Sequence, residues 1–264
     1  MDKLLDVRGI TCQFGGLRAI DDVSISVEPS SIVGVIGPNG AGKTVLLNLI
    51  SGVYKPVSGS ITIAGTDTRN LRSDQVARLG VARTFQSTEQ FSEFRAIEYV
   101  MLGGFYQQCR SMTACIFGLN RVAKREKAEK LRALEVLDRL GLAHVALEQM
   151  THLPYGVQKQ VDLARAMAAE PQLLLLDEPT SGTTSTERVA IARTLQELGE
   201  SDRTVLVVDH DVRFLSGHCE QLVAMNYGRK IAAGPVAEVL ADRGVREAYL
   251  GIKESEVAST EESA

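Results

Sequence analysis

The chain has 264 residues, of which 44% are hydrophobic and 23% are charged, and its formal net charge is −4. This composition predicts a globular chain with a sizeable core, and the lack of a basic tail or a Lys/Arg-rich stripe argues against nucleic acid as the main partner. No apolar run approaches the roughly 20 residues that span a bilayer, and the first residues are neither long nor apolar enough for a signal peptide, so we expect a cytoplasmic protein.

Short β-like runs separated by turns fill the chain from about Leu4 to Ile63. The runs IDDVSISVE and SGSITIAG have the alternating, β-branched character of strands. Between them, the apolar run from Ile32 to Ile36 is typical of a buried strand, and one apolar face of a short helix follows and ends near Gly52. The residues of that face are Leu46, Leu47, Leu49 and Ile50. We therefore expect strands of a mixed sheet here.

The octapeptide GPNGAGKT, from Gly37 to Thr44, connects that strand to that helix. Gly37 and Gly42 allow backbone N–H groups to turn inward around a polyphosphate, which also faces a helix N-terminus. Lys43 supplies a positive charge, and the Thr44 hydroxyl can coordinate magnesium. A Gly-rich turn without function is the alternative, but the flanking strand and helix lie on the correct sides. The residues expected to bind the nucleotide here are Gly37, Pro38, Asn39, Gly40, Ala41, Gly42, Lys43, Thr44 and Val45.

From about Ser87 to Leu153 the pattern becomes helical, which predicts an inserted helical subdomain. The charge run from Arg121 to Arg132 has two interpretations, a helix on a membrane surface or a solvated helix face. Acidic residues are interleaved in it, so the solvated face is favoured. Leucines at helical spacing are expected to dock this helix, namely Leu131, Leu134, Leu137 and Leu140.

After Leu153 an α/β pattern resumes, with apolar strands at LLLLD and TVLVVD and a helix from about Thr186 to Leu198 between them. Strands that alternate with helices predict a parallel sheet. The tail after Gly251 is acidic, poor in apolar residues and expected to be disordered. No CxxC pair occurs, so neither a zinc site nor a disulfide framework is expected of Cys12, Cys109, Cys115 and Cys219.

Asp177 and Glu178 follow the strand Leu173 to Leu176, at the edge where ligands gather in α/β sheets. A phosphate loop needs an acidic partner for its metal, so Asp177 is expected to hold magnesium, mostly through water. Glu178 would orient or deprotonate the water that attacks the γ-phosphate. An isolated Asp-Glu pair is common in caps and loops, but this pair follows an apolar strand in a chain with a phosphate loop.

The order of these motifs, with LPYGVQKQVDLARAM before LLLLDEP and VLVVDHD after it, resembles that of the ATP-binding-cassette (ABC) ATPases. The resemblance runs from about Leu4 to Gly251. Within the family, the segments GGLRAI, ARTFQ, LPYGVQKQ and AYLG are most similar to the larger ATPase subunit of branched-chain amino acid importers. ATP and Mg²⁺ are the implied cofactors.

The resemblance implies an α/β fold of the P-loop NTPase class, with a mixed sheet core, an antiparallel β subdomain and an inserted helical subdomain. Residues 1–251 would form a single ABC ATPase domain. Within it, residues 1–86 and 154–251 would form the catalytic core and residues 87–153 the helical subdomain, leaving residues 252–264 as a disordered acidic tail.

The resemblance also assigns individual residues. Phe14 matches the aromatic residue that stacks on adenine, Gln86 the glutamine that senses metal and attacking water, and His210 the switch histidine that contacts the γ-phosphate. Taken singly, Phe14 could be core packing, Gln86 a surface amide and His210 a helix-capping histidine. The implied catalytic residues are Glu178, His210, Gln86 and Lys43, and the implied metal ligands are Thr44, Gln86 and Asp177.

The segment Leu153 to Gln158 matches the family signature, which contacts the γ-phosphate bound by the opposite subunit and so implies a dimer. The widespread form has Ser then Gly before a further Gly, whereas this chain has Pro154 and Tyr155 before Gly156. Without the serine hydroxyl, phosphate contact has to rest on backbone amides and on the helix dipole. The implied interface residues are Tyr155, Gly156 and Gln158.

A second departure from the family follows Pro179. A loop that crosses the dimer interface usually carries Leu and then Asp or Asn, whereas this chain has Thr183 and Thr184. The acidic or amide side chain is therefore missing, and only the Thr184 hydroxyl is offered in its place. This change would affect communication between the two ATP sites of a dimer.

Such an ATPase closes two subunits over two ATP molecules and moves membrane partners when it reopens. The implied partners are a second ABC ATPase subunit, two transmembrane permease subunits and, indirectly, an extracytoplasmic solute-binding protein. The chain would lie peripherally on the cytoplasmic face of the inner membrane. An aromatic cluster has two open interpretations, a groove for permease loops or the subdomain's own core. Its members are Phe85, Phe91, Phe94, Tyr99, Phe105 and Tyr106.

The sequence thus predicts the energy-coupling ATPase of an importer for branched-chain amino acids or related small solutes. One alternative is an ABC ATPase that acts on nucleic acid or ribosomes, although the zinc, basic or coiled-coil insertions typical of that class are not evident. The other is a weakly hydrolysing regulatory cassette, suggested by Thr183 and Thr184. The solute, the transport direction and the choice of homodimer or heterodimer are left open by the sequence.

Overall fold

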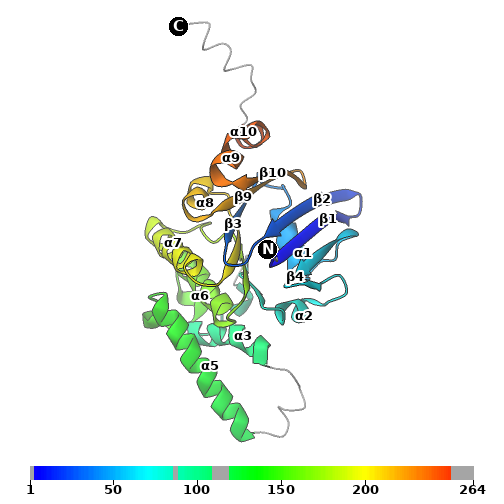
Figure 1. The fold of residues 1–264 in the computed structure, drawn as a ribbon. Helices are drawn as coiled ribbons and strands as arrows, with labels where there is room; N and C mark the ends of the chain where they lie inside the picture. Colours follow the sequence, from blue (N-terminus) through cyan, green and yellow to red (C-terminus); the bar gives the residue numbers. More distant parts are fainter. Residues whose placement is uncertain (1–2, 86–88, 109–118, 251–264) are drawn as a thin grey trace, which may run out of the picture.

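The computed structural model describes residues 3–85, 89–108 and 119–250. Within these residues the strands form two sheets, and helices lie around and below them (Figure 1). The strands are β1 (Leu5–Phe14), β2 (Leu17–Val27), β3 (Ile32–Ile36), β4 (Ser58–Ile63), β5 (Thr66–Asp67), β6 (Val81–Arg83), β7 (Leu173–Asp177), β8 (Thr204–Val208), β9 (Gln221–Asn226) and β10 (Arg229–Pro235). The helices are α1 (Lys43–Ile50), α2 (Ser73–Ala77), α3 (Ala96–Gln108), α5 (Leu119–Arg139), α6 (Tyr155–Ala168), α7 (Ser185–Gly199), α8 (Val212–His218), α9 (Val236–Ala241) and α10 (Arg243–Leu250), with short 3-10 helices η1 (Glu89–Phe91), η2 (Ala143–Val145) and η3 (Met150–His152).

The larger sheet has the strand order β10-β9-β3-β8-β7-β6. Neighbouring strands from β9 to β6 pair in parallel, and β10 pairs antiparallel with β9. Every residue of β3, β7 and β8 is buried, because both faces of the sheet are covered, as parallel strands require. Alternate side chains therefore enter different cores: Leu173 and Leu175 join one cluster, and Leu174 and Leu176 join another. The predicted buried strands are confirmed.

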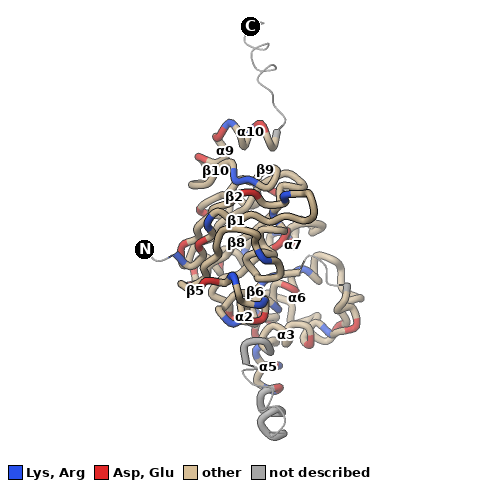
Figure 2. Tube along the Cα trace, turned by 90° about the vertical axis from the view of Figure 1, so that its right-hand side faces the viewer, with Lys and Arg blue, Asp and Glu red and all other residues tan. Residues whose placement is uncertain are grey.

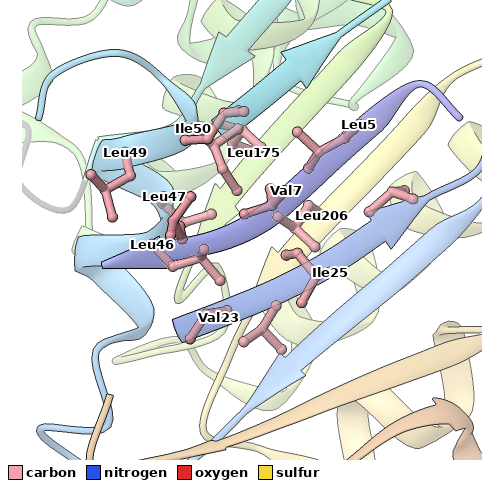
Figure 3. Packing of buried hydrophobic residues seen from close by; sticks show 14 of the residues in the cluster. Leu5, Val7, Val23, Ile25, Leu46, Leu47, Leu49, Ile50, Leu175 and Leu206 are labelled. Atoms are coloured by element: carbon pink, nitrogen blue, oxygen red, sulfur yellow. The ribbon is translucent and has the colours of Figure 1, made fainter. Parts of the chain in front are cut away.

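The smaller sheet is antiparallel, with the order β2-β1-β4-β5, and it faces the larger one across α1. Apolar side chains from both sheets and from the helix fill the space between them (Figure 3). Helix α1 contributes the predicted face, and its partners in Figure 3 are Leu5, Val7, Val23, Ile25, Leu175 and Leu206. Because α1 begins at Lys43, this packing fixes the end of the phosphate loop. The predicted fold class, with a mixed core sheet and an antiparallel β part, is confirmed.

Helices α3, α5 and α6 share a separate core below the sheets, in which Tyr99 and Leu137 are fully buried (Figure 1). The prediction that all four leucines dock α5 is wrong for Leu131, which is 52% exposed. Leu131 lies six residues before Leu137, which is about 120° around a helix and therefore off the buried stripe. Leu134 and Leu140 do pack against this core.

In Figure 2 the positions of acidic and basic residues are interspersed along the described trace, and the basic ones do not gather as a stripe in this view. In the described part of the chain, no helix has the length and apolar character needed to cross a bilayer. The division into a core of residues 1–86 and 154–251 with a subdomain of residues 87–153 stays a prediction, and residues 252–264 lie outside the described ranges.

Candidate nucleotide site

Three segments meet at the carboxyl edge of the larger sheet. The phosphate loop leaves β3 at Gly37, Asp177 ends β7, and Asp209 follows β8. The strand register places the ends of β3, β7 and β8 side by side, because Val208 pairs with both Val35 and Asp177. Acidic groups and the phosphate loop are thus brought together by adjacent parallel strands, as ligand sites in α/β sheets are.

Lys43 is the cation inside the phosphate loop, and only 6% of it is exposed. Its Nζ donates to the carbonyl oxygens of Gly37 at 2.6 Å and Pro38 at 3.0 Å. Burial lowers the pKa of this ammonium, while the carboxylates of Glu178 and Asp177 oppose that shift. Gly37 is required by close packing, because a Cβ there would collide with the carbonyl of Met225.

Asp177 is buried and has different partners on its two oxygens. Its Oδ1 accepts from the Thr44 hydroxyl at 3.5 Å, and its Oδ2 accepts from Nη2 of Arg83 at 2.8 Å. Arg83 also donates to the side chain of Asn48 on α1. The sequence analysis missed Arg83, because a lone Arg on a short edge strand carries no local signal of its partner.

Glu178 is half-buried and has a φ of 49°, a left-handed conformation that is uncommon for a non-glycine residue. Its N–H donates to Val208 O at 2.8 Å, and Nζ of Lys159 donates to its carbonyl oxygen. These two contacts hold the strained backbone, and strain of this kind clusters at functional sites. Burial lowers the pKa of Lys159, against the opposing effect of Glu178 and other nearby carboxylates.

Asp209, which the sequence analysis did not select, ties the ends of β7 and β8 together. Its fully buried carboxylate accepts from the Thr180 N–H at 3.0 Å and the Thr180 hydroxyl at 2.7 Å. His210 follows with its side chain 56% exposed and its Nδ1 3.5 Å from Asp209 Oδ1. The helix-capping alternative for His210 is not borne out, because Asp211 caps α8 by accepting from Phe214 N.

Phe14 ends β1 and is 44% exposed, so it is not a core residue. Its ring makes an edge contact with Tyr54, with the centroids 5.1 Å apart. The exposure of Phe14 is compatible with the expected contact to a planar ligand.

The signature segment begins α6. Tyr155 is 48% exposed, Gly156 is buried, and Gln158 donates from Nε2 to Leu153 O at 2.9 Å. A Cβ at Gly156 would collide with the carboxylate of Glu187, which would have to move to make room for it. Glu187 therefore joins the signature segment to α7, a contact that the sequence analysis missed.

The exposed Thr184 bonds through its hydroxyl to its own helix, and its role toward a partner subunit stays a prediction. Its Oγ1 donates to Glu187 Oε2 at 2.9 Å and accepts from Glu187 N at 3.3 Å, which forms a capping box at the start of α7. Thr183 likewise donates to Thr180 O at 2.7 Å. Both hydroxyls serve their own loop.

Gln86 lies outside the described residues, but the backbone just before it is firmly held. Asp162 accepts from Phe85 N at 2.6 Å, from the Tyr99 hydroxyl at 2.7 Å and from Nε of Arg165 at 2.8 Å. Arg165 also donates to Arg83 O at 2.6 Å. Burial and the Asp162 charge raise the pKa of Tyr99, which keeps its hydroxyl a donor. This junction of α3, α6 and the end of β6 was missed; its only signal was an Asp on a helix with a buried apolar face.

The interpretation of the aromatic cluster as the subdomain's own core holds for some of its members, and the interpretation as a groove for permease loops stays a prediction. Tyr99 is core, and Phe91 packs against that core. Phe85 is 41% exposed and lines a cavity of about 520 Å³ between α1, α2, β6 and α6. Phe94 is 38% exposed. The side chains of Phe105 and Tyr106 lie outside the described residues.

The chain belongs to the ABC transporter family of ATPases. The family model described as "ABC transporter" matches residues 20–181, and the model described as "Branched-chain amino acid ATP-binding cassette transporter" matches residues 229–254. The predictions of the family and of the ATPase class are thereby confirmed.

Among curated relatives, the chain is 36% identical to the high-affinity branched-chain amino acid transport ATP-binding protein LivG of Escherichia coli K12, covering 94% of this chain and 98% of LivG. It is 32% identical to the corresponding BraF of Pseudomonas aeruginosa, again covering 94% and 98% of the two chains. Among solved structures, it is similar to the ADP conformation of the ATP-binding cassette MJ1267, with a TM-score of 0.81, 28% identity and coverage of 96% and 100%. A dimeric ABC transporter cassette, MJ0796, gives a TM-score of 0.74 at 26% identity over 88% and 98%.

Proposed function

We propose that this chain is the ATP-hydrolysing, energy-coupling subunit of an importer for branched-chain amino acids or related small solutes. Two observations taken together support the proposal. The phosphate loop and the two acidic strand ends meet at one edge of the sheet. The C-terminal part of the same chain matches the branched-chain family model. The names of the two relatives support the solute class.

In this proposal the backbone N–H groups from Gly37 to Thr44 bind the phosphates of ATP, and the Lys43 ammonium adds charge. Lys43 is poised for this, because its present partners are carbonyl oxygens that a phosphate would outcompete. Phe14, exposed at the end of β1, would stack on the adenine ring. The remaining loop residues, Pro38, Asn39, Gly40, Ala41, Gly42 and Val45, shape the loop.

The donor set fits Mg²⁺, which prefers hard oxygen ligands. Thr44 and Asp177 would hold the ion together with Gln86. The Oγ1 atom of Thr44 and the Oδ1 atom of Asp177 lie 3.5 Å apart. Arg83 keeps the other oxygen of Asp177 occupied, so that one oxygen of the carboxylate faces Thr44. The ion would neutralise charge on the transferred phosphate.

Glu178 would orient or deprotonate the attacking water, and its fixed, strained backbone holds the carboxylate at the edge of the sheet. His210, exposed beside Asp209, would contact the γ-phosphate. Gln86 would report the state of the site to the helices below it, through the segment that Asp162 holds.

The second ATP contact would come from a second cassette. Tyr155, Gly156 and Gln158 lie at the N-terminus of α6, where backbone N–H groups and the helix dipole favour an anion. Two transmembrane permease subunits would complete the unit, with their loops in the cavity lined by Phe85, and the chain would lie at the cytoplasmic face of the inner membrane. The solute would be selected by an extracytoplasmic binding protein and the permeases.

The test is to tag the Glu178→Gln variant in its native cell, solubilise membranes gently with ATP present, and identify what co-purifies. Recovery of two membrane subunits and a second cassette supports the proposal. Recovery of ribosomes or nucleic acid without any membrane protein overturns it in favour of the alternative class.

A further inference from the structure

Tyr249, on α10, reaches across to the first residue of the phosphate loop. Its hydroxyl accepts from Gly37 N at 3.1 Å and lies 3.2 Å from Gly37 O, to which it donates. Gly37 is buried and lies one residue beyond the end of β3. One hydroxyl therefore satisfies both polar backbone groups of the residue at which the chain leaves the sheet and enters the loop.

The same carbonyl oxygen has a second donor. Lys43 Nζ lies 2.6 Å from Gly37 O, so the ammonium and the Tyr249 hydroxyl share one acceptor. A bound phosphate would draw the ammonium away from the carbonyl, because a charge-assisted contact to an anion is the stronger one. Among the described residues, the Tyr249 hydroxyl would then be the donor left to the buried Gly37 O, and a buried carbonyl without any donor is unfavourable.

The helix that carries Tyr249 is itself anchored. Val245 is 3% exposed and belongs to the core of the larger sheet that contains Leu174 and Leu176. The Tyr249 ring packs against that core. Asp242 accepts from Val245 N at 3.0 Å at the start of α10. The hydroxyl therefore approaches Gly37 from a fixed support that lies inside the segment matched by the branched-chain family model.

We propose that Tyr249 is a positioning residue of the phosphate loop: its hydroxyl holds the Gly37 peptide in place when the Lys43 ammonium leaves it for a bound phosphate. The inference rests on the phosphate site proposed above. It gives α10 a role in nucleotide affinity, although α10 itself contributes no residue to the proposed phosphate contacts.

The test compares Tyr249→Phe with Tyr227→Phe in the full chain. Tyr227 lines a cavity beside the phosphate loop, and residues of α10 line the same cavity. Tyr227 is 86% exposed, and its hydroxyl makes no hydrogen bond within the described part of the chain. Binding of ATP is measured by calorimetry without turnover. Loss of one neutral hydrogen bond should weaken binding about three- to tenfold in Tyr249→Phe and leave Tyr227→Phe unchanged. Equal affinities in all three proteins would overturn the inference.

A second measurement separates positioning from mere packing. In the nucleotide-free protein, Tyr249→Phe should lower the melting temperature more in a Lys43→Ala background than in the wild type, because the carbonyl then loses both donors. Equal drops in the two backgrounds would contradict the shared acceptor. If Lys43→Ala itself bound ATP as tightly as the wild type, the proposed phosphate site would be wrong; if only Tyr249→Phe were without effect, that site would stand and the role of Tyr249 would fall.

Discussion

Two faces of the molecule, named here for their proposed roles, use different chemistry. The phosphate face, formed by Gly37 to Thr44 and the ends of β7 and β8, is built from buried charged groups that hold one another, such as Arg83 on Asp177. The signature face is formed by residues 154–158 and 180–187. Tyr155 and Thr184 are exposed there, while the Thr183 and Thr184 hydroxyls and the Glu187 carboxylate bond within the face. By this comparison the first face would act through side-chain charge, and the second would act through backbone geometry.

The contrast explains why the two departures from the family pattern are tolerable together. Pro154 begins α6 as its N-cap with an extended ψ of 146°, which suits proline at a helix start. Thr184 caps α7 through Glu187, whose carboxylate in turn packs on Gly156. A face that relies on fixed backbone needs such local caps more than it needs a reactive side chain.

The largest expected effect is on the phosphate face, at Glu178. Glu178→Gln should lower ATP turnover in the complete complex at least about 100-fold, since a general base contributes on that order, while ATP binding is retained. Steady-state phosphate release and ATP binding by calorimetry check this. Glu197→Gln, a partly exposed carboxylate on α7 that pairs with Arg139 and Arg193, is the control and should be normal. Normal turnover in Glu178→Gln would remove the assigned role.

Lys43→Ala should act on binding, because it removes a charged donor from the phosphate loop. Loss of one charge-assisted hydrogen bond predicts roughly ten- to 100-fold weaker ATP binding. Lys230→Ala, which removes a partly exposed lysine bonded to Ser24 O, is the control. An unchanged dissociation constant for Lys43→Ala would contradict the charge-based account of the phosphate face.

The signature face should be sensitive to a single methyl group. Gly156→Ala places a Cβ 2.1 Å from the Glu187 carboxylate, so either that side chain or the first turn of α6 has to shift. We expect ATP-driven dimerisation of the Glu178→Gln form to weaken, as measured by sedimentation. Gly217→Ala on α8, where a Cβ meets nothing within 4 Å, is the control. Unimpaired dimers of Gly156→Ala would break the backbone account of this face.

The smallest expected effect concerns Thr184. Thr184→Ala removes the cap of α7 and should lower the free energy of unfolding by about 1 kcal/mol. Dimerisation should be preserved, because the hydroxyl bonds within its own loop. Thr186→Ala, in the first turn of the same helix, controls for loss of a hydroxyl. Urea unfolding together with sedimentation decides this, and a defect in dimerisation without lost stability would show that the hydroxyl does serve the partner.

Local pattern was sufficient for the phosphate loop, the buried strands and the acidic pair after β7, because each is encoded within a few adjacent residues. Arg83, Asp162 and Tyr249 could not be found that way, since each acts on a residue far along the chain that only the sheet order brings near. Leu131 was misplaced because leucine spacing alone does not say which part of a helix faces the core. The capping role of Thr184 was not seen, because the capping box with Glu187 was not considered in reading this loop.

We propose that ATP hydrolysis by this chain drives uptake of a branched-chain amino acid. The most direct measurement is uptake of radiolabelled leucine, isoleucine and valine into proteoliposomes that hold the co-purified complex and its binding protein, with ATP on the cassette side. ATP-dependent accumulation is expected with the wild-type chain and none with Glu178→Gln. ATP hydrolysis without uptake of any of the three amino acids, or equal uptake with both proteins, would contradict it.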